Sequence, residues 1–176
     1  MKGERLKRAY KMRRLAAAGR YHLILFTDEK IFTVEQHHNS QNNLRLLPKG
    51  SLHPPTVSQS HFPSSIMVWA GICATGKTAL VFFEKGVKIS AKVHQGQTLK
   101  GVPEPWARQH SGNQEWTLQQ DWATSHSAKT TLALCEELFP NIWKKGIWPS
   151  NSPDLNPMDY SIWSILEREV FSTIHN

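Results

Sequence analysis

Short apolar runs that end at polar residues occupy much of the first half of the chain. Each run is too short for a buried helix and is rich in β-branched or aromatic side chains, so it predicts a β-strand. Polar or glycine-bearing segments separate the runs, as expected for tight turns. The strands predicted here are residues 23–26, 31–34, 66–72 and 79–83, with turns at 27–29 and 75–77 and a weak strand near 44–47 inside the polar stretch 37–63.

Apolar positions at helical spacing alternate with two further short runs in the second half. The last helix has strong start signals, because Asn156 suits an N-cap and Pro157 suits the first helical position. The predicted helices are 4–18 at the start of the chain, 90–110 with a break near Pro103 and Pro105, 125–138 and 157–171; the predicted strands are 116–121 and 147–148.

This order of elements predicts an α/β fold with a mixed sheet of about five strands flanked by helices. A chain of 176 residues can bury one sizeable core. No apolar run approaches the ~20 residues of a membrane-spanning helix, so we expect no membrane association. The two cysteines, Cys73 and Cys135, lie far apart, which favours a reducing compartment over a disulfide scaffold.

The positive charge is concentrated at one end of the chain. The first twenty positions hold eight of the 21 basic residues and one of the 14 acidic residues, so they account for the whole formal net charge of +7. Such a segment suits contacts with DNA phosphates, although a solvated basic helix explains it equally well. The candidate DNA contacts in this segment are Lys7, Arg8, Lys11, Arg13 and Arg14.

Residues 71–78 match the P-loop pattern G-x-x-x-x-G-K-[ST] letter for letter. A P-loop must open a helix whose N-terminus faces the phosphates. Here Lys77 and Thr78 run directly into the apolar strand predicted at 79–83. We therefore interpret the segment as a hairpin turn and keep a P-loop nucleotide-binding protein as the third hypothesis.

Three acids stand out by position. Asp28 and Asp121 each follow an apolar strand, and Asp159 lies in the first turn of the last predicted helix. Carboxylates placed this way can hold two divalent cations ~3.5–4 Å apart, the arrangement that serves in-line phosphoryl displacement. Taken singly, each acid has a simpler explanation: a turn residue, a strand terminator, and a helix-dipole partner worth roughly 0.3–1 kcal/mol.

Four motifs occur in a fixed order: F-T-D-E-K-I-F at 26–32, M-V-W-A-G-I at 67–72, Q-Q-D-x-A-x-x-H at 119–126, and W-P-x-x-S-P-D-L-N-P-x-D at 148–159. Over roughly residues 21–170 this series resembles the catalytic domain of mariner-type transposases, in the Tc/mariner superfamily. The resemblance implies an RNase H-like fold. It also identifies Asp28, Asp121 and Asp159 as catalytic residues that bind the metal, as in the branch whose third acid is an aspartate.

The resemblance further implies two-metal cleavage of DNA phosphodiesters and strand transfer in DNA transposition, with Mg²⁺ or Mn²⁺. The implied partner is DNA, both transposon ends and target, and an intact relative is expected to be a homodimer. The expected location is the nucleus in a eukaryote and otherwise the cell interior. On this basis residues 1–20 are a basic helical arm or linker, and 21–176 are a catalytic domain expected to be a fragment truncated at its C-terminus.

Neighbouring residues receive expectations too. Asp154 is structural in the family, and Glu29 faces away from Asp28 if the strand continues. His126 is expected to contact DNA or a carboxylate, although a surface or helix-capping histidine explains its position equally well. Trp122 stands where the family has a small residue, so its ring is expected either to crowd the site or to turn into the core. The alternative function is a catalytically decayed or domesticated transposase-derived DNA-binding protein.

Overall fold

The computed structural model describes residues 2–17, 19–33, 64–112, 115–144, 146–149 and 152–172. The weak strand predicted near 44–47 lies outside the described residues, as does most of the polar stretch around it. Among the described helices, none is long and apolar enough to cross a membrane.

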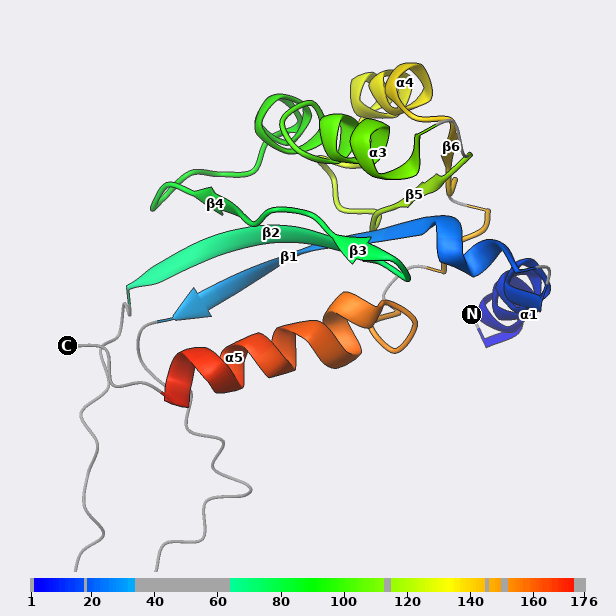
Figure 1. Ribbon diagram of the computed structural model, residues 1–176, viewed down its shortest axis with the longest axis horizontal. Helices are drawn as coiled ribbons and strands as arrows, with labels where there is room; N and C mark the ends of the chain where they lie inside the picture. The colour runs from blue at the N-terminus through cyan, green and yellow to red at the C-terminus, as the bar shows by residue number, and fades with distance from the viewer. Residues whose placement is uncertain are drawn as a thin grey trace, which may run out of the picture.

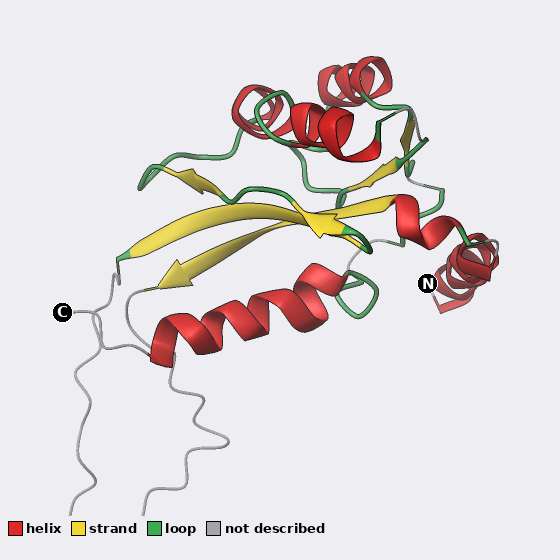
Figure 2. Cartoon of the chain, viewed as in Figure 1, coloured by secondary structure: helices red, strands yellow, loops and turns green. Residues whose placement is uncertain are grey.

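In the described residues a mixed sheet of six strands forms the centre of the molecule, in agreement with the predicted mixed sheet of about five (Figures 1 and 2). The strand order is β3-β2-β1-β5-β6, and β4 also pairs with β2. The β1–β2 pair is antiparallel, whereas β1–β5 and β5–β6 are parallel. The strands are β1 (Ile24–Thr33), β2 (Ser65–Cys73), β3 (Gly76–Lys77), β4 (Val81–Phe83), β5 (Thr117–Gln119) and β6 (Asn141–Ile142).

The prediction of two short strands joined by a turn at 27–29 is wrong, because β1 is one continuous strand of 10 residues. The polar residues at its centre pair with β2 instead of forming a turn: Thr27 lies opposite Gly71, and Asp28 lies opposite Ala70. On the other side, the Thr27 hydroxyl donates a hydrogen bond to the carbonyl of Gln119 at 2.8 Å. Backbone pairing with β2 overrides the local preference of polar residues for a turn.

Helices cover both faces of the sheet. The α3 side holds α2, η2, α3 and α4, and the α5 side holds η3 and α5 (Figure 1). Successive residues of β1 alternate between the two sides. Leu25 packs in a core cluster with Leu99 on the α3 side, whereas the aromatic ring of Phe32 contacts Trp163 on the α5 side.

Every helix predicted from the sequence is present in the predicted order with shifted ends, although two of them are divided into shorter elements, and η1 is an additional short helix. The break in the predicted helix 90–110 is present, and α3 begins at Pro103 itself. The strand predicted at 147–148 is wrong: Trp148 is buried among aromatic rings, and the strand in this region is β6 instead. The helices are α1 (Lys2–Ala17), η1 (Arg20–Leu23), α2 (Ala91–Val93), η2 (His94–Leu99), α3 (Pro103–Ser111), α4 (Lys129–Leu138), η3 (Met158–Ile162) and α5 (Trp163–Ser172).

The segment that matches the P-loop pattern forms a β-hairpin. The backbone N–H of Gly71 donates to the Thr78 hydroxyl at 2.9 Å, and Thr78 N–H donates to the Gly71 carbonyl at 2.9 Å. A Cβ at position 76 would lie 2.8 Å from the His110 ring, so any other residue there would displace that ring. Residues 78–80 continue without a helix, so the segment has no helix N-terminus to face a phosphate.

An aromatic cluster on the α5 side joins the start of the sheet to α1. Ile24, Trp143 and Trp148 are its buried members. Two α1 residues, Met12 and Leu15, pack against it, and so does Trp122. The Trp122 ring therefore turns into the core, which is the harmless one of the two orientations expected from the sequence.

Because Trp122 packs in this cluster, Trp122→Ala is expected to destabilise the fold by about 2 kcal/mol or more. For a chain of this size that corresponds to a fall in melting temperature of roughly 5 °C or more. Trp122→Phe keeps an aromatic ring in place and serves as the control, with a smaller fall. Equal melting temperatures for the Ala variant and the unsubstituted chain would contradict the packing role.

Candidate active site

The parallel pairing of β1 with β5 brings the first two acids to the same level of the sheet. The last paired residues are Phe26 on β1 and Gln119 on β5. Asp28 and Asp121 each lie two residues further along. Asp28 is thus in the middle of β1 rather than at a strand end, and Asp121 follows the end of β5 by two residues.

The third acid approaches from the α5 side. Asn156 caps the helix, because its side-chain oxygen accepts a hydrogen bond from Met158 N–H at 3.2 Å. Its backbone carbonyl accepts from Asp159 N–H at 3.0 Å and from Tyr160 N–H at 3.1 Å. This cap fixes the first helical turn, and the Asp159 carboxyl reaches the side chain of Asp28. The structure therefore brings together all three acids that the sequence singles out.

Burial and mutual repulsion act on these carboxyls. Burial raises the pKa of Asp28 to about 7, and the charges of Asp159 and Glu29 add to this effect. Burial and the charge of Asp121 raise the pKa of Asp159, against its hydrogen bonds with Asn156 and Asp28. Clustered carboxyls that resist ionisation are the pattern expected where a cation or a proton is needed between them.

Trp163 is a member of the site that the sequence interpretation missed. Its indole N–H donates to Asp28 Oδ2 at 2.7 Å, and the ring is buried. Trp163 lies four residues after Asp159, so the two side chains lie near one another on the helix. That spacing is the signal that could have identified it.

Asp121 is held from the α3 side. Its Oδ1 accepts a hydrogen bond from Ala123 N–H at 2.9 Å and lies 2.6 Å from His126 Nδ1. Burial disfavours the ionised carboxyl, but the hydrogen bonds from His126 and Ala123 and the charges of His126 and His94 together outweigh it and lower the pKa of Asp121. Asp121 is therefore an ionised carboxylate with one oxygen already engaged.

The expectation that His126 contacts DNA does not fit its surroundings. His126 is only 3% exposed, so its ring has almost no surface for a phosphate. Of the two expected contacts, the carboxylate is the one present. Burial disfavours the imidazolium, but the hydrogen bond with Asp121 and the charge of Glu29 outweigh it and raise the pKa of His126 to about 10.

Glu29 and His94 complete a second group of titratable side chains on the α3 side, across β1 from Asp28. His126 Nε2 lies 3.2 Å from Glu29 Oε1, and His94 Nδ1 lies 3.6 Å from the same atom. The rings of His94 and His126 are close, with centroids 4.0 Å apart. Burial and the charge of His126 lower the pKa of His94 to about 4.

Asp154 points away from the three acids and pairs with Arg5 of α1. The five basic candidates of α1 divide by exposure. Arg8 is half-buried, and its guanidinium donates to the Trp148 carbonyl at 3.3 Å. The exposed candidates are Lys7, Lys11, Arg13 and Arg14. Residues 1–20 thus include a helix that packs on the body.

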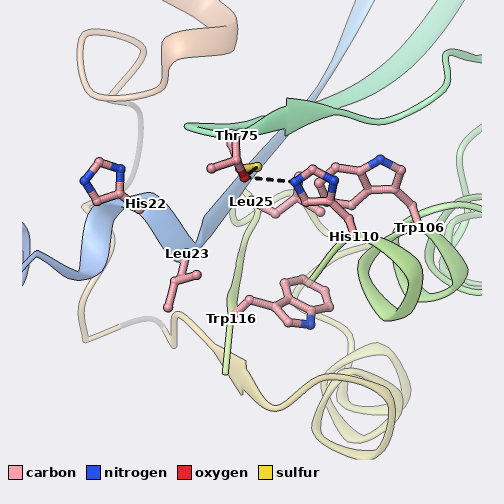
Figure 3. A pocket seen from close by; sticks show the side chains of 8 residues that line it. His22, Leu23, Leu25, Thr75, Trp106, His110 and Trp116 are labelled. Atoms are coloured by element: carbon pink, nitrogen blue, oxygen red, sulfur yellow. Dashed lines mark hydrogen bonds between the residues drawn. The ribbon is translucent and has the colours of Figure 1, made fainter. Parts of the chain in front are cut away.

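A separate pocket lies beside the β2–β3 turn, between that turn, β1 and α3 (Figure 3). His110 stacks on Trp106 with centroids 4.4 Å apart, and its Nε2 lies 2.9 Å from the Thr75 hydroxyl (Figure 3). None of the three aspartates lines this pocket. It forms no part of the carboxylate site.

The carboxylate site fits divalent cations by the chemistry of its donors. It offers oxygen ligands from Asp28, Asp121 and Asp159, and hard cations such as Mg²⁺ prefer such ligands. The repulsion that raises the pKa values of Asp28 and Asp159 would be relieved by positive charge between them.

Comparison with known sequences finds transposases. The chain is 31% identical over 116 residues to the Tcb1 transposase of Caenorhabditis briggsae, a match that covers 66% of this chain and 39% of the relative. It is 27% identical over 126 residues to the Tc1 transposase of Caenorhabditis elegans, covering 70% of this chain and 43% of that protein. The chain thus spans about two fifths of the length of these relatives. No family model matches it.

Solved structures with the same fold include Mos1 mariner transposases. The Mos1 paired-end complex with Mn aligns with a TM-score of 0.77 at 18% identity, covering 95% of this chain and 48% of that one. The Mos1 catalytic domain aligns with a TM-score of 0.67 at 16% identity, covering 98% of this chain and 72% of that one. The expectation of an RNase H-like α/β fold is confirmed.

Two independent findings agree. The sequence matches are transposases of the Tc1 type, and the fold is that of a mariner transposase catalytic domain. The four motifs that suggested the resemblance form the strands, the turn and the helix start around the carboxylate site. The chain is a relative of the mariner-type transposases and has the RNase H-like fold of their catalytic domain.

Proposed function

We propose that this chain is a transposase catalytic domain that cleaves DNA phosphodiesters and joins DNA strands with the help of two divalent cations, Mg²⁺ or Mn²⁺. The observation that supports it best is the meeting of Asp28, Asp121 and Asp159 at one level of the sheet. The Mos1 structures with Mn and with Mg, which share this fold, favour the same metals.

Each carboxylate has a distinct position for this chemistry. Asp28 lies centrally on β1 and interacts with Asp159, so it is suited to bridge two ions. Asp121 and Asp159 approach from different elements, and each would complete one coordination sphere. When bound, the ions would supply Lewis acidity and activate a water for attack on phosphorus.

Surrounding residues would keep the carboxylates in place. The indole N–H of Trp163 holds one oxygen of Asp28. Asn156 fixes the helix start that directs Asp159. Lys30 forms an ion pair with Glu167 at 3.0 Å, which ties β1 to α5 beside the site. Such preorganisation limits the movement that the ligands must make during the reaction.

The proposed partner is DNA, as transposon ends and as target. The Mos1 relatives of the fold were solved as a paired-end complex with a transposon end and as a strand transfer complex. In this chain the exposed basic residues of α1 provide a surface of the right charge. Pairing of two ends would place two such chains in one complex, so a homodimer is part of the proposal.

If the proposal is right, the chain nicks supercoiled DNA in Mn²⁺ or Mg²⁺ and not in a chelator. Asp28→Asn, Asp121→Asn and Asp159→Asn should each lower the rate by roughly 100-fold or more, the scale on which one preorganised group acts. Asp154→Asn is the matched control, since Asp154 pairs with Arg5 outside the site, and it should keep activity. DNA binding without metal-dependent nicking would favour the non-catalytic DNA-binding alternative.

The raised pKa of Asp28 predicts a stability effect in metal-free protein. A carboxyl with a folded pKa of about 7 and an ordinary value of 3.8 loses stability as pH rises between these two values. Asp28→Asn lacks this charge, so it should melt a few degrees higher than the unsubstituted chain at about pH 8, by a smaller margin at about pH 5, and gain little only at about pH 4 or below. Added Mg²⁺ should stabilise the unsubstituted chain alone. Differential scanning fluorimetry across pH measures both, and a pH-independent difference would contradict the argument.

Binding of DNA phosphates by α1 predicts a change in salt dependence. Replacing Lys11, Arg13 and Arg14 by Gln should weaken DNA binding and flatten the log–log salt slope by roughly 0.9 for each phosphate that α1 no longer neutralises. These residues are exposed, so the fold should persist. The control replaces three other exposed lysines, Lys88, Lys92 and Lys100. Equal slopes for the two triple variants would show that α1 is only a solvated helix.

A further inference from the structure

The group on the α3 side of β1 has two acceptor atoms that face each other without a donor between them. Glu29 Oε1 and His94 Nδ1 are buried, and neither makes a well-formed hydrogen bond among the described residues. Besides His94, the charged neighbour of Glu29 Oε1 is His126, whose Nε2 lies 3.2 Å away. They lie 3.6 Å apart. A carboxylate oxygen and an imidazole nitrogen in this arrangement require a proton or a cation between them.

The tautomer of His94 follows from its other nitrogen. His94 Nε2 lies 3.1 Å from Gln120 Oε1, and the amide nitrogen of Gln120 is directed to Cys135 Sγ at 3.9 Å. In this orientation of the amide, Nε2 is the N–H donor. In the neutral ring, Nδ1 then carries a lone pair directed toward Glu29. The whole His94 residue is only 1% exposed.

His126 presents a third donor atom to the same point. Its Nε2 lies 3.2 Å from Glu29 Oε1, and the ligand atoms of the three side chains all lie within 4.8 Å of one another. Two ligands at ~2.0–2.1 Å from a tetrahedral zinc ion lie about 3.3 Å apart. The two distances to Glu29 are close to that value.

We propose that Glu29, His94 and His126 bind one zinc-class transition-metal dication, at a site on the opposite side of β1 from Asp28 and Asp159. Two imidazoles and one carboxylate are the donor set that zinc accepts readily, and a fourth position stays open for water. The ion takes the place of the proton that would otherwise lie between His126 Nε2 and Glu29. The carboxylate oxygens on the Asp28 side of β1 would favour hard cations such as Mg²⁺. The imidazole nitrogens on the α3 side would favour zinc-class ions.

The other nitrogen of His126 connects this site with Asp121. His126 Nδ1 lies 2.6 Å from Asp121 Oδ1, so an imidazole bound to metal through Nε2 donates its remaining N–H to that carboxylate. Carboxylate–histidine–metal chains of this kind fix the tautomer and the ring direction of the histidine. Bound zinc would thereby hold one oxygen of Asp121 in place, a positioning effect that rests on the proposed function, whereas zinc binding itself does not.

The test uses the full chain, stripped of metal, with Asp28→Asn and Asp159→Asn introduced together so that the carboxylate site cannot bind. Zinc is titrated against a chromophoric chelator, and cobalt(II) serves as the visible-absorption probe. We expect one equivalent of zinc to bind and the cobalt spectrum to be that of a low-coordinate ion with nitrogen ligands. Absence of stoichiometric zinc binding in this background would overturn the proposal and leave a protonated His126 as the buried cation.

Ligand identity is tested in the same background. Glu29→Gln and His94→Ala should each weaken zinc binding by roughly 100-fold or more, since even outer-shell partners are worth 10–100-fold. His110→Gln removes an imidazole elsewhere and should bind zinc as before. Because His94→Ala could unfold the chain, X-ray absorption on the bound zinc provides a second measurement. Two imidazole ligands support the site, and a shell of oxygen ligands alone would overturn it. Neither result depends on nicking activity, so failure of one proposal can be told from failure of the other.

Discussion

Parallel pairing between β1 and β5 is the constraint on which the site depends. It joins strands that lie far apart in the sequence and sets Phe26 level with Gln119, so the residues that follow come to the same height. A slip of one residue in this register would send Asp28 or Asp121 to the wrong side of the sheet, because side chains alternate along a strand. The antiparallel pairing of β1 with β2 extends over eight residue pairs and holds β1 against such a slip.

The same alternation gives β1 two chemically different sides. Asp28 faces Trp163 on the α5 side, and Glu29, the next residue, faces two histidines on the α3 side. Asp121 has left the sheet at the end of β5, so its carboxylate is not confined to one side. Asp121 interacts with Asp159 and also with His126, so it connects the groups on the two sides of β1.

Features set by neighbouring residues were predictable from the sequence, and features set by distant ones were not. The cap at Asn156 and the helix start before Asp159 follow from local side-chain chemistry and are present. The supposed turn at 27–29 is a strand, because β2 and β5 supply partners that a local pattern does not reveal. Residues 147–148 are apolar because they pack in an aromatic cluster, and they do not belong to the sheet. Trp163 was missed since its hydrogen bond to Asp28 spans 135 residues.

That long separation in sequence affects when the site forms during synthesis and folding. Asp28 is synthesised early, and the helix that provides Asp159 and Trp163 leaves the ribosome much later, as does β5 between them. Contacts of high sequence separation form slowly and late in folding. A nascent or partly folded chain therefore has scattered carboxylates rather than a metal site. Under the proposed function, the site for DNA cleavage would therefore assemble only after the helix that carries Asp159 has been synthesised.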